Sequence, residues 1–406
     1  MKFRSELLKS HNLYVVLGAL ALVYIAKILR CAYATPLRTV PGPWHSKFTS
    51  FWLKKQILSG RRMHWIHEQH QKYGPVVRVG PNEVDFTDQS AFKEIHRIGS
   101  GYNKDPWYTS FRTGETQDVF SMTNPREHAQ RRKLFSPLFS NSNLAANWYH
   151  TIIDKVNTTV NKIKEEAYQN GEVDIFKWWT FMTADVISHL AFGEPFGMLE
   201  QGKKTYHMQK IDEASKFGLL CSELPWIRYI VNWTPIRAVQ ELDADSIIQH
   251  LAEQVMQKTR GNGLGATHVF SRIVAVNEKD KNALTDYELA FEAGGFIVAG
   301  SGTTAVSLTY LVWAVLSDPE VQAKLEAEVG ALQDGYTDTE LENLSYLSAV
   351  IEETLRMYSA APGALPRVVP NGGATLGGYF IPEGTTASTQ AYSYHRDATV
   401  YPNPER

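Results

Sequence analysis

The feature that most constrains the fold is a long stretch without charge in the second half of the chain. Residues 293–316 carry no charged side chain. Upstream, Thr285 and Glu288 have the spacing of a capping box, in which the threonine oxygen accepts from the third helical N–H and the glutamate reaches back. Downstream, Pro319 can end one helix and begin the next. The sequence therefore predicts one helix between Thr285 and Ser317. Roughly 30 helical residues give a length of about 45 Å, which is enough to cross a large domain.

The middle of this helix is polar and rich in glycine. Residues 301–304 read Ser-Gly-Thr-Thr, and glycines also stand at 294, 295 and 300. Each glycine weakens a helix by up to about 1 kcal/mol relative to alanine. A second transmembrane span is an open alternative, because an apolar helix of this length could cross a bilayer. A weak, hydroxyl-lined centre instead indicates a buried helix whose backbone something must approach closely.

The N-terminal residues form another apolar segment. Leu13–Ala26 is an unbroken run of apolar or small residues. The run extends through Leu29 if Lys27 snorkels, which gives about 17 residues, just enough to span a bilayer. We therefore expect a membrane anchor over residues 1–34. A cleaved secretory signal is the open alternative, since the Ala-Tyr-Ala sequence at 32–34 resembles a cleavage site.

Proline and glycine separate this anchor from the rest of the chain. The sequence Val-Pro-Gly-Pro-Trp predicts a stiff hinge over residues 35–45. No later linker or internal repeat divides the chain, so residues 46–406 are expected to form one large body. Its pattern is mainly helical between 125 and 320, whereas residues 76–86 predict a β-hairpin and residues 375–389 predict strands and turns. The expected fold class is mainly α with a small β portion (α+β).

Composition narrows the class of function. The 406 residues are 43% hydrophobic and 12% aromatic, which supports a large core. A net charge of -2 and a pI near 6.7 give no general attraction to nucleic acid, and we expect no nucleic-acid partner. The chain has two cysteines, Cys31 and Cys221, in dissimilar apolar contexts. They argue against a disulfide framework or a zinc site.

Several motifs occur in an order that resembles one family. In chain order they are His128-Ala129-Gln130-Arg131-Arg132, Ala299-Gly300-Ser301-Gly302-Thr303-Thr304, Glu353-Thr354-Leu355-Arg356, Leu365-Pro366-Arg367, His395-Arg396-Asp397 and Pro402-Asn403-Pro404-Glu405-Arg406. Together with the anchor and hinge, the set resembles the cytochrome P-450 family of heme-thiolate monooxygenases. The sequence of residues 73–83 is similar to that of the fungal microsomal branch. The resemblance implies a P-450-like fold with a long central helix on the distal side of the heme, incomplete at the C-terminus.

The resemblance assigns catalytic roles to the central helix. Thr303 is expected to hydrogen-bond iron-bound dioxygen and its ordered water, because proton delivery needs a donor within reach. Gly302 stands where an acid is usual, so Thr304, Ser301 and water, or the substrate, would have to take over that part of the relay. Ala299 and Gly300 are expected to lie against the heme. The alternative for Thr303 is a hydroxyl that bonds back to its own helix.

Other residues are expected to bind or support the heme. His128 and Arg132 lie four apart on a helix, and the resemblance directs both at a heme propionate, with Arg367 as a further cation. For His128 a partly buried structural histidine is an equal alternative. Glu353 and Arg356 are expected to form a structural, buried ion pair. A basic cluster of Arg126, Arg131 and Lys133 is either a solvated helix face or a docking surface for an acidic electron donor.

The same resemblance implies a cysteine thiolate on the heme iron, carried by a glycine-rich loop expected beyond Arg406. Cys31 belongs to the expected anchor, and Cys221 lacks the glycine and arginine of that loop. We expect neither to be a metal ligand. Two interpretations stay open: the sequence is an incomplete record of a working monooxygenase, or the 406 residues are an inactive membrane-bound fragment or pseudoenzyme.

For the first interpretation the resemblance implies a complete activity. The enzyme would insert one oxygen atom from O2 into a hydrophobic small molecule, in specialised (secondary) metabolite biosynthesis. It would use heme b, O2 and NADPH-derived electrons delivered by a reductase. Its membrane would be the endoplasmic reticulum, with a single N-terminal anchor and the body on the cytoplasmic side.

Overall fold

The computed structural model describes residues 2–111, 116–224, 226–227, 233 and 284–405. These residues fall into two compact units. The first combines both ends of the chain, Met1–Asp105 and Gly363–Arg406, and the second is the continuous stretch Pro106–Pro362.

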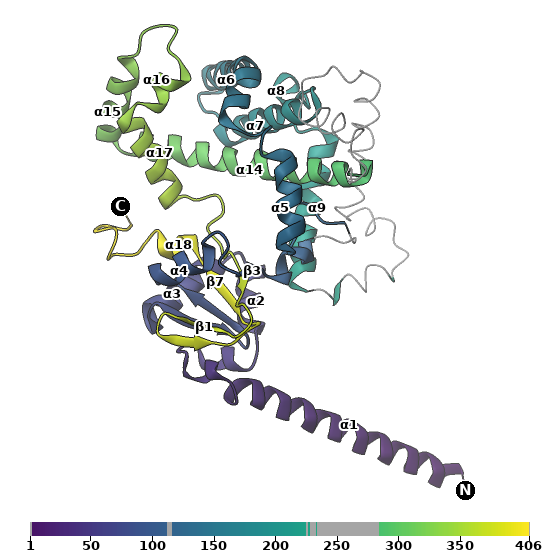
Figure 1. Cartoon of the computed structure of the whole chain (residues 1–406). Coiled ribbons are helices and arrows are strands. Elements are labelled where there is room, and N and C mark those ends of the chain that lie inside the picture. The colour runs from purple at the N-terminus through teal and green to yellow at the C-terminus, as the bar shows by residue number, and fades with distance from the viewer. Residues whose placement is uncertain (1, 112–115, 225, 228–232, 234–283, 406) are drawn as a thin grey trace. The chain divides into compact units, whose positions relative to one another are not determined.

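The first unit contains the anchor segment and all of the β-strands in the described part of the chain (Figure 1). Its helices are α1 (Lys2–Tyr33), η1 (Pro36–Thr39), η2 (Trp44–Lys47), α2 (Phe51–Leu58), α3 (Arg62–Tyr73), α4 (Gln89–His96) and α18 (Ala391–Tyr394). Its strands are β1 (Val76–Gly80), β2 (Glu83–Phe86), β3 (Asn103–Lys104), β4 (Arg367–Val368), β5 (Ala374–Leu376), β6 (Tyr379–Ile381) and β7 (Thr386–Thr389).

Five of these strands form one sheet in the order β1-β2-β7-β4-β3. The hairpin predicted at residues 76–86 is confirmed, because β1 pairs antiparallel with β2, with Val76 opposite Phe86. Strand β2 then pairs in parallel with β7, Glu83 opposite Thr386. The strands and turns predicted at 375–389 are also present, with β5 and β6 forming a separate two-stranded sheet.

The segment between α1 and the sheet is folded onto the sheet. Leu37 and Val40 are about 1% exposed and belong to the core that contains Val76 and Phe86. Arg78 of β1 is fully buried, and its guanidinium donates to the carbonyl oxygens of Cys31, Ala32, Leu37 and Pro81. Cys31 and Ala32 lie in the last turn of α1, where carbonyl groups lack partners within the helix. One arginine therefore joins α1, the following segment and the hairpin.

The second unit is helical (Figure 1). It consists of η3 (Pro106–Phe111), α5 (Pro125–Phe135), α6 (Asn141–Asn170), α7 (Ile175–Phe192), α8 (Met198–Gln201), α9 (Tyr206–Glu223), α14 (Asp286–Ser317), α15 (Pro319–Gly330), α16 (Asp338–Glu342) and α17 (Ser345–Met357). The two units together confirm the expected class of mainly α with a small β portion.

Helix α14 confirms the long helix predicted from the sequence. Its N-cap Thr285 accepts from the backbone N–H of Glu288, whose side chain accepts from the Thr285 N–H, so the capping box is complete. The helix ends at Ser317, and α15 begins at Pro319. It packs along α7, where the Thr183 hydroxyl donates to the Ser301 carbonyl at 2.8 Å.

Two helices of the described chain are long and apolar enough to cross a membrane, Val15–Tyr33 and Tyr287–Ser317. Length and composition alone do not distinguish a span from a signal sequence or a core helix. The first segment is almost entirely exposed, whereas the second packs against α7. These environments favour the first segment as the candidate for insertion in lipid.

Candidate functional site

Helix α14 has a packed side and an open side at its centre. Ile297, Ser301 and Ala305 are fully buried, and the Ser301 hydroxyl donates back to the Ile297 carbonyl at 2.7 Å. The exposed residues of the same turns are Val298, Ala299, Gly302, Thr303 and Thr304. The open side therefore presents small side chains, a bare glycine backbone and two hydroxyl groups.

Thr303 lies on this open side but bonds to its own helix. Its hydroxyl donates to the Ala299 carbonyl at 2.6 Å, which is the alternative that the sequence left open. A hydroxyl that donates one hydrogen bond keeps two lone pairs as acceptors. Thr303 and Thr304 are both exposed. The catalytic role expected for them remains a prediction.

Gly300 lies on the side of α14 that faces α7. A Cβ at this position would lie 3.0 Å from Cγ1 of Ile187, whereas a Cβ at Gly302 would meet nothing within 4 Å. The glycine at 300 therefore lets two helices approach closely, and the glycine at 302 leaves the open side flat. Contact with heme, expected for Ala299 and Gly300, remains a prediction that the exposure of Ala299 supports directly.

Two of the expected propionate ligands lie on α5. His128 is half-buried and Arg132 is exposed, one helical turn apart. In the described part of the chain the exposed Arg132 guanidinium pairs with no carboxylate, so it is available to an external anion. Their role at a heme propionate remains a prediction.

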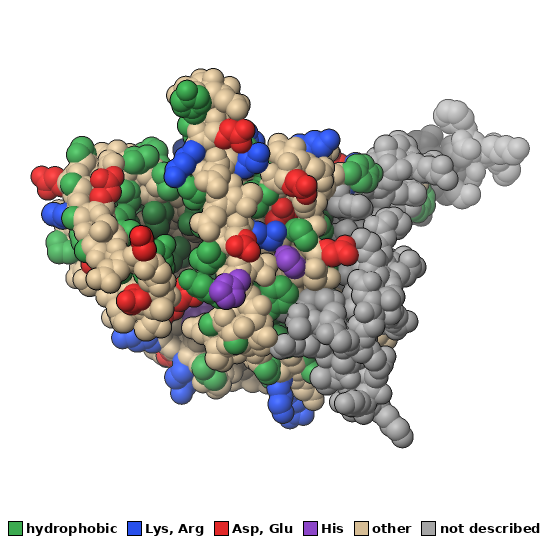
Figure 2. All heavy atoms as spheres, turned by 90° about the horizontal axis from the view of Figure 1, so that it is seen from above, with side chains coloured by type: hydrophobic (Ala, Val, Ile, Leu, Met, Phe, Trp, Pro, Cys, Tyr) green, Lys and Arg blue, Asp and Glu red, His purple; other side chains and the backbone are tan. Residues whose placement is uncertain are grey.

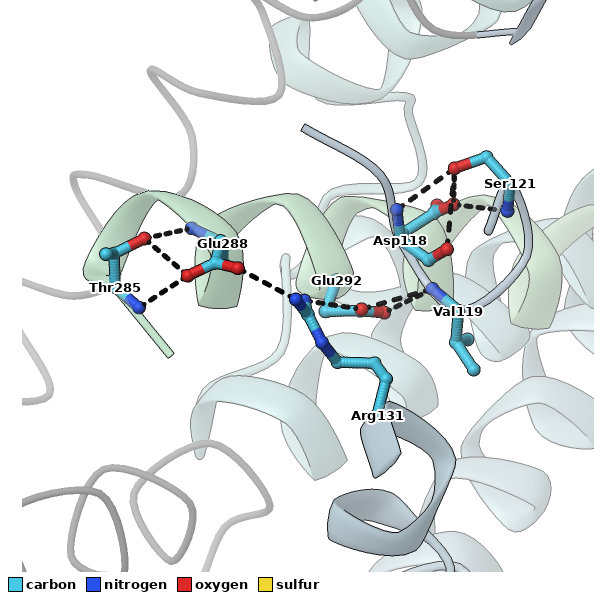
Figure 3. Close-up of polar contacts among 7 residues, drawn as sticks. All are labelled: Asp118, Val119, Ser121, Arg131, Thr285, Glu288 and Glu292. Carbon is cyan, nitrogen blue, oxygen red and sulfur yellow. Dashed lines mark hydrogen bonds and ion pairs between the residues drawn. The ribbon is translucent and has the colours of Figure 1, made fainter. Parts of the chain in front are cut away.

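Arg131, which the sequence grouped with an exposed basic cluster, is buried. Its guanidinium donates to Glu288 at 2.8 Å and to Glu292 at 3.0 Å, both on α14 (Figure 3). Glu292 also accepts from the backbone N–H of Val119, at 3.1 Å to each carboxylate oxygen. The interpretation of Arg131 as part of a solvated or docking face is therefore wrong, because long-range carboxylates neutralise its charge. Of that cluster, Arg126 and Lys133 are exposed.

The sequence did not identify Glu292 as a functional candidate. The one signal was its place, a charged residue directly before a stretch of 24 positions without charge, 293–316. Its carboxylate is about 1% exposed. A buried carboxylate is retained where cations and N–H donors compensate the loss of hydration.

Arg367 belongs to the first unit, in β4. Its Nε is buried without a hydrogen-bond partner among the described residues. Nearby, His96 shares a hydrogen bond of 2.7 Å with the Thr389 hydroxyl, and burial together with the charge of Arg367 lowers the pKa of His96 to about 4. A buried N–H without an acceptor favours the binding of an anion, so this orphaned atom supports the predicted propionate role.

Glu353 and Arg356 of α17 form the expected ion pair. Arg356 donates from Nε at 2.7 Å and from Nη2 at 2.6 Å, one bond to each carboxylate oxygen. The hydrogen bonds from Arg356 lower the pKa of Glu353. Arg356 is 6% exposed but Glu353 is 53% exposed, so burial applies to the arginine alone. The structural role assigned to the pair remains a prediction.

The described residues suit a heme in part. In the second unit, the open side of α14 and the exposed guanidinium of Arg132 suit a flat ring system with carboxylate substituents. In the first unit, taken by itself, the buried Nε of Arg367 suits an anion. Neither cysteine suits the role of iron ligand, because Cys31 lies exposed in α1 and Cys221 lies buried in α9. In the described part of the chain, no group of three or more His, Cys, Asp or Glu residues could hold a metal ion. We therefore assign no residue of this sequence to the iron.

On the face drawn in Figure 2, basic and acidic side chains are interspersed over the described surface. Surfaces of mixed charge create weaker long-range attraction than surfaces of a single sign. A docking surface for an electron donor would therefore depend on local residues such as Arg126 and Lys133.

Comparison with known proteins assigns the family. The chain is 37% identical to the cytochrome P-450 monooxygenase tazI of Aspergillus terreus, over 98% of this chain and 82% of the relative. It is 36% identical to the cytochrome P-450 monooxygenase cypX of Dothistroma septosporum, over 96% and 78%. It is 29% identical to the methylphloroacetophenone oxidase of Cladonia uncialis, over 94% and 87%. The cytochrome P-450 family model matches residues 41–406, and the chain belongs to the cytochrome P-450 monooxygenase family.

Proposed function

We propose that this chain is the heme-binding polypeptide of a monooxygenase that inserts one oxygen atom from O2 into a hydrophobic small molecule. The observation that carries the proposal is the open side of α14, where Ala299, Gly302 and Thr303 are exposed while the opposite side packs on α7. Heme, when bound, supplies the redox chemistry that activates dioxygen.

The chain's own residues have defined parts in this proposal. Arg132, His128 and Arg367 would bind the heme propionates, since guanidinium groups recognise carboxylates through charge-assisted hydrogen bonds. Ala299 and Gly302 would leave room for the ring system. The Thr303 hydroxyl would accept or pass on a proton at its Oγ1. Glu353 and Arg356 would hold the end of α17 in place.

Relatives and apolar segments together support the substrate class. One relative is named for methylphloroacetophenone, an aromatic ketone. The aromatic side chains of η3 and the small side chains on the open side of α14 suit a molecule of that general kind. We infer a hydrophobic, ring-containing substrate in specialised metabolism, with electrons from NADPH through a reductase and α1 inserted in the endoplasmic reticulum membrane.

The placement of both cysteines favours a second candidate. If residues 1–406 act alone, they form a membrane-bound protein without heme-thiolate chemistry, because Cys31 lies in the anchor helix and Cys221 is buried in α9. Both candidates predict that the purified 406-residue chain, supplied with hemin and reduced under carbon monoxide, shows no thiolate-type band. The Cys221→Ser variant is the matched control, and a thiolate band that this variant abolishes would contradict our assignment.

Sequencing of the transcript beyond the codon for Arg406 separates the two candidates. A reading frame that continues into a glycine-rich loop with a cysteine supports the monooxygenase, and the extended chain should then bind heme with a thiolate-type spectrum and oxidise apolar substrates. An immediate stop codon contradicts the monooxygenase and leaves the second candidate.

A further inference from the structure

A short segment of chain, residues 118–121, lies against the N-terminal part of α14. The side chain of Glu292 binds the backbone of this segment, because both of its carboxylate oxygens accept from the Val119 N–H. The same carboxylate accepts from Arg131, so α5, α14 and the segment meet at one side chain (Figure 3). The partners lie 173 and 161 positions from Glu292 in the sequence, so the contact is a tertiary one.

Glu292 points to the same side of α14 as the candidate heme face. Ala299 and Thr303 follow it by seven and eleven residues, which is about two and three turns of a helix with 3.6 residues per turn. They therefore lie about 10 and 16 Å further along the same side. Glu292 is covered, at 1% exposure, whereas Ala299 and Thr303 are exposed. The segment at Val119 thus closes one end of an otherwise open face.

The segment also has an internal support. Its turn is held by Asp118, whose Oδ1 accepts from the Ser121 N–H at 2.8 Å and from the Ser121 hydroxyl at 2.6 Å. Both residues are about 1% exposed or less. Such an Asx-type turn fixes the direction of the Val119 N–H before it meets Glu292.

The side chain that this segment presents is aromatic. Phe120 is 50% exposed, and its ring lies 5.3 Å from the Tyr108 ring and 5.8 Å from the Phe111 ring, both edge-on. Trp107 continues the group, 4.6 Å from Phe111. These rings of η3 and the segment form an aromatic wall, defined here as Trp107, Tyr108, Phe111 and Phe120.

We propose that Glu292 is a positioning residue that holds the aromatic wall at the end of the α14 face and so limits how far a ring-containing substrate extends over Ala299 and Thr303. Arg131 supports this role by neutralising the Glu292 carboxylate. The use of the face rests on the proposed function, but the tie between Glu292 and Val119 can be measured without heme or substrate.

The test is hydrogen–deuterium exchange of the 116–124 peptide in the full chain, resolved to the Val119 amide by fragmentation. Glu292→Ala removes the acceptor, and exchange at Val119 should accelerate about tenfold or more. Glu292→Gln keeps one amide oxygen as acceptor and should retain most of the protection. Glu288→Gln is the matched control, because Glu288 pairs with Arg131 but does not contact Val119.

A double variant tests the part of Arg131. Arg131→Met leaves the buried Glu292 carboxylate without its cation, so the segment should loosen. Arg131→Met combined with Glu292→Gln should restore protection, because position 292 then carries no unpaired charge. Unchanged exchange of the 345–357 peptide shows that each variant is folded.

The proposal is overturned if Glu292→Ala leaves the Val119 amide as protected as before, or if Glu288→Gln accelerates it equally. Either result is independent of heme, so it is distinguishable from failure of the proposed monooxygenase function. If Glu292 holds the wall and the transcript nevertheless ends at Arg406, the positioning role stands while the catalytic proposal falls.

Discussion

At the scale of single residues, the environment of a charged group decides whether it can act on a ligand. Arg131 and Arg132 are neighbours on α5, yet the first is buried between two carboxylates and the second is exposed. Because a neutralised cation gains little from another anion, Arg132 is the better candidate for binding a propionate.

The electrostatic effect of Arg367 on His96 can be tested through the pKa of that histidine. Burial is the larger cause of the low pKa of His96, and the charge of Arg367 is the second. We expect Arg367→Met to raise the pKa of His96 from about 4 by part of the way to 6.5, measured by NMR titration of the imidazole. Arg97→Met, an exposed neighbour, should leave that pKa unchanged.

The sign for stability follows from the same shift. The folded state favours neutral His96 over its protonated form. The contribution of His96 to the free energy of unfolding is therefore complete above pH 6.5 and is lost as the pH falls through about 4. In Arg367→Met the loss should be smaller. A His96 pKa that does not move in this variant would show that the two groups do not interact.

Local residue patterns were enough to name candidate site residues. They did not predict which of the nearby charged residues form ion pairs with one another. Thr303 and Arg367 were named from local motifs. Thr303 is exposed on α14, and the Arg367 Nε is buried without a hydrogen-bond partner among the described residues. The burial of Arg131 could not be read from the chain, since its partner Glu292 lies 161 positions away. The back-bond of Thr303 is local, and the sequence did name it as an alternative.

At the scale of secondary-structure elements, the boundaries that follow from local chemistry were predicted well. The Thr285–Glu288 capping box and Pro319 set the ends of α14, and Gly74 caps the helix before the hairpin. The pairing of β2 with β7 was not predicted, because parallel strands from opposite ends of the chain share no local signal.

The two central glycines of α14 should respond differently to alanine. Gly302→Ala adds a methyl group that meets nothing within 4 Å and should raise the free energy of unfolding by about 0.5–1 kcal/mol through helix propensity. Gly300→Ala gains the same propensity but places its methyl group 3.0 Å from Ile187, which should cancel or reverse the gain by about 1–3 kcal/mol.

Urea unfolding of both variants measures the difference between them. Ile187→Ala combined with Gly300→Ala should remove the crowding, although the smaller side chain at 187 has its own packing cost, so the informative quantity is the coupling energy of the double-mutant cycle. Equal midpoints for Gly300→Ala and Gly302→Ala would contradict the close approach of α7 to α14.

At the scale of the whole molecule, the proposed attachment to a membrane depends on the exposed apolar helix α1. Leu20 and Leu22 are 60% and 69% exposed. An arginine near the centre of a transmembrane helix costs about 2.5–3.5 kcal/mol on insertion scales. Leu20→Arg with Leu22→Arg should therefore move the protein from the carbonate-resistant membrane pellet to the supernatant.

Leu58→Arg, at an exposed apolar position of α2, is the matched control and should stay in the pellet. N-terminal sequencing of the mature protein distinguishes the anchor from a cleaved signal, because cleavage after Ala34 would give a chain that starts at Thr35. A double variant that remains in the pellet would contradict anchoring by α1.

The parallel pairing of β2 with β7 has a consequence for the order in which the protein forms on the ribosome. Asn82 donates to the Gly384 carbonyl, 302 positions later, so the five-stranded sheet cannot close until the chain has been synthesised beyond β7. The helical unit, one continuous stretch from Pro106 to Pro362, can fold earlier. Until β7 is available, the edge of β2 in the nascent β1–β2 hairpin has unpaired backbone groups, and such an edge favours aggregation. Early insertion of α1 in a membrane would keep these nascent chains apart from one another during that interval.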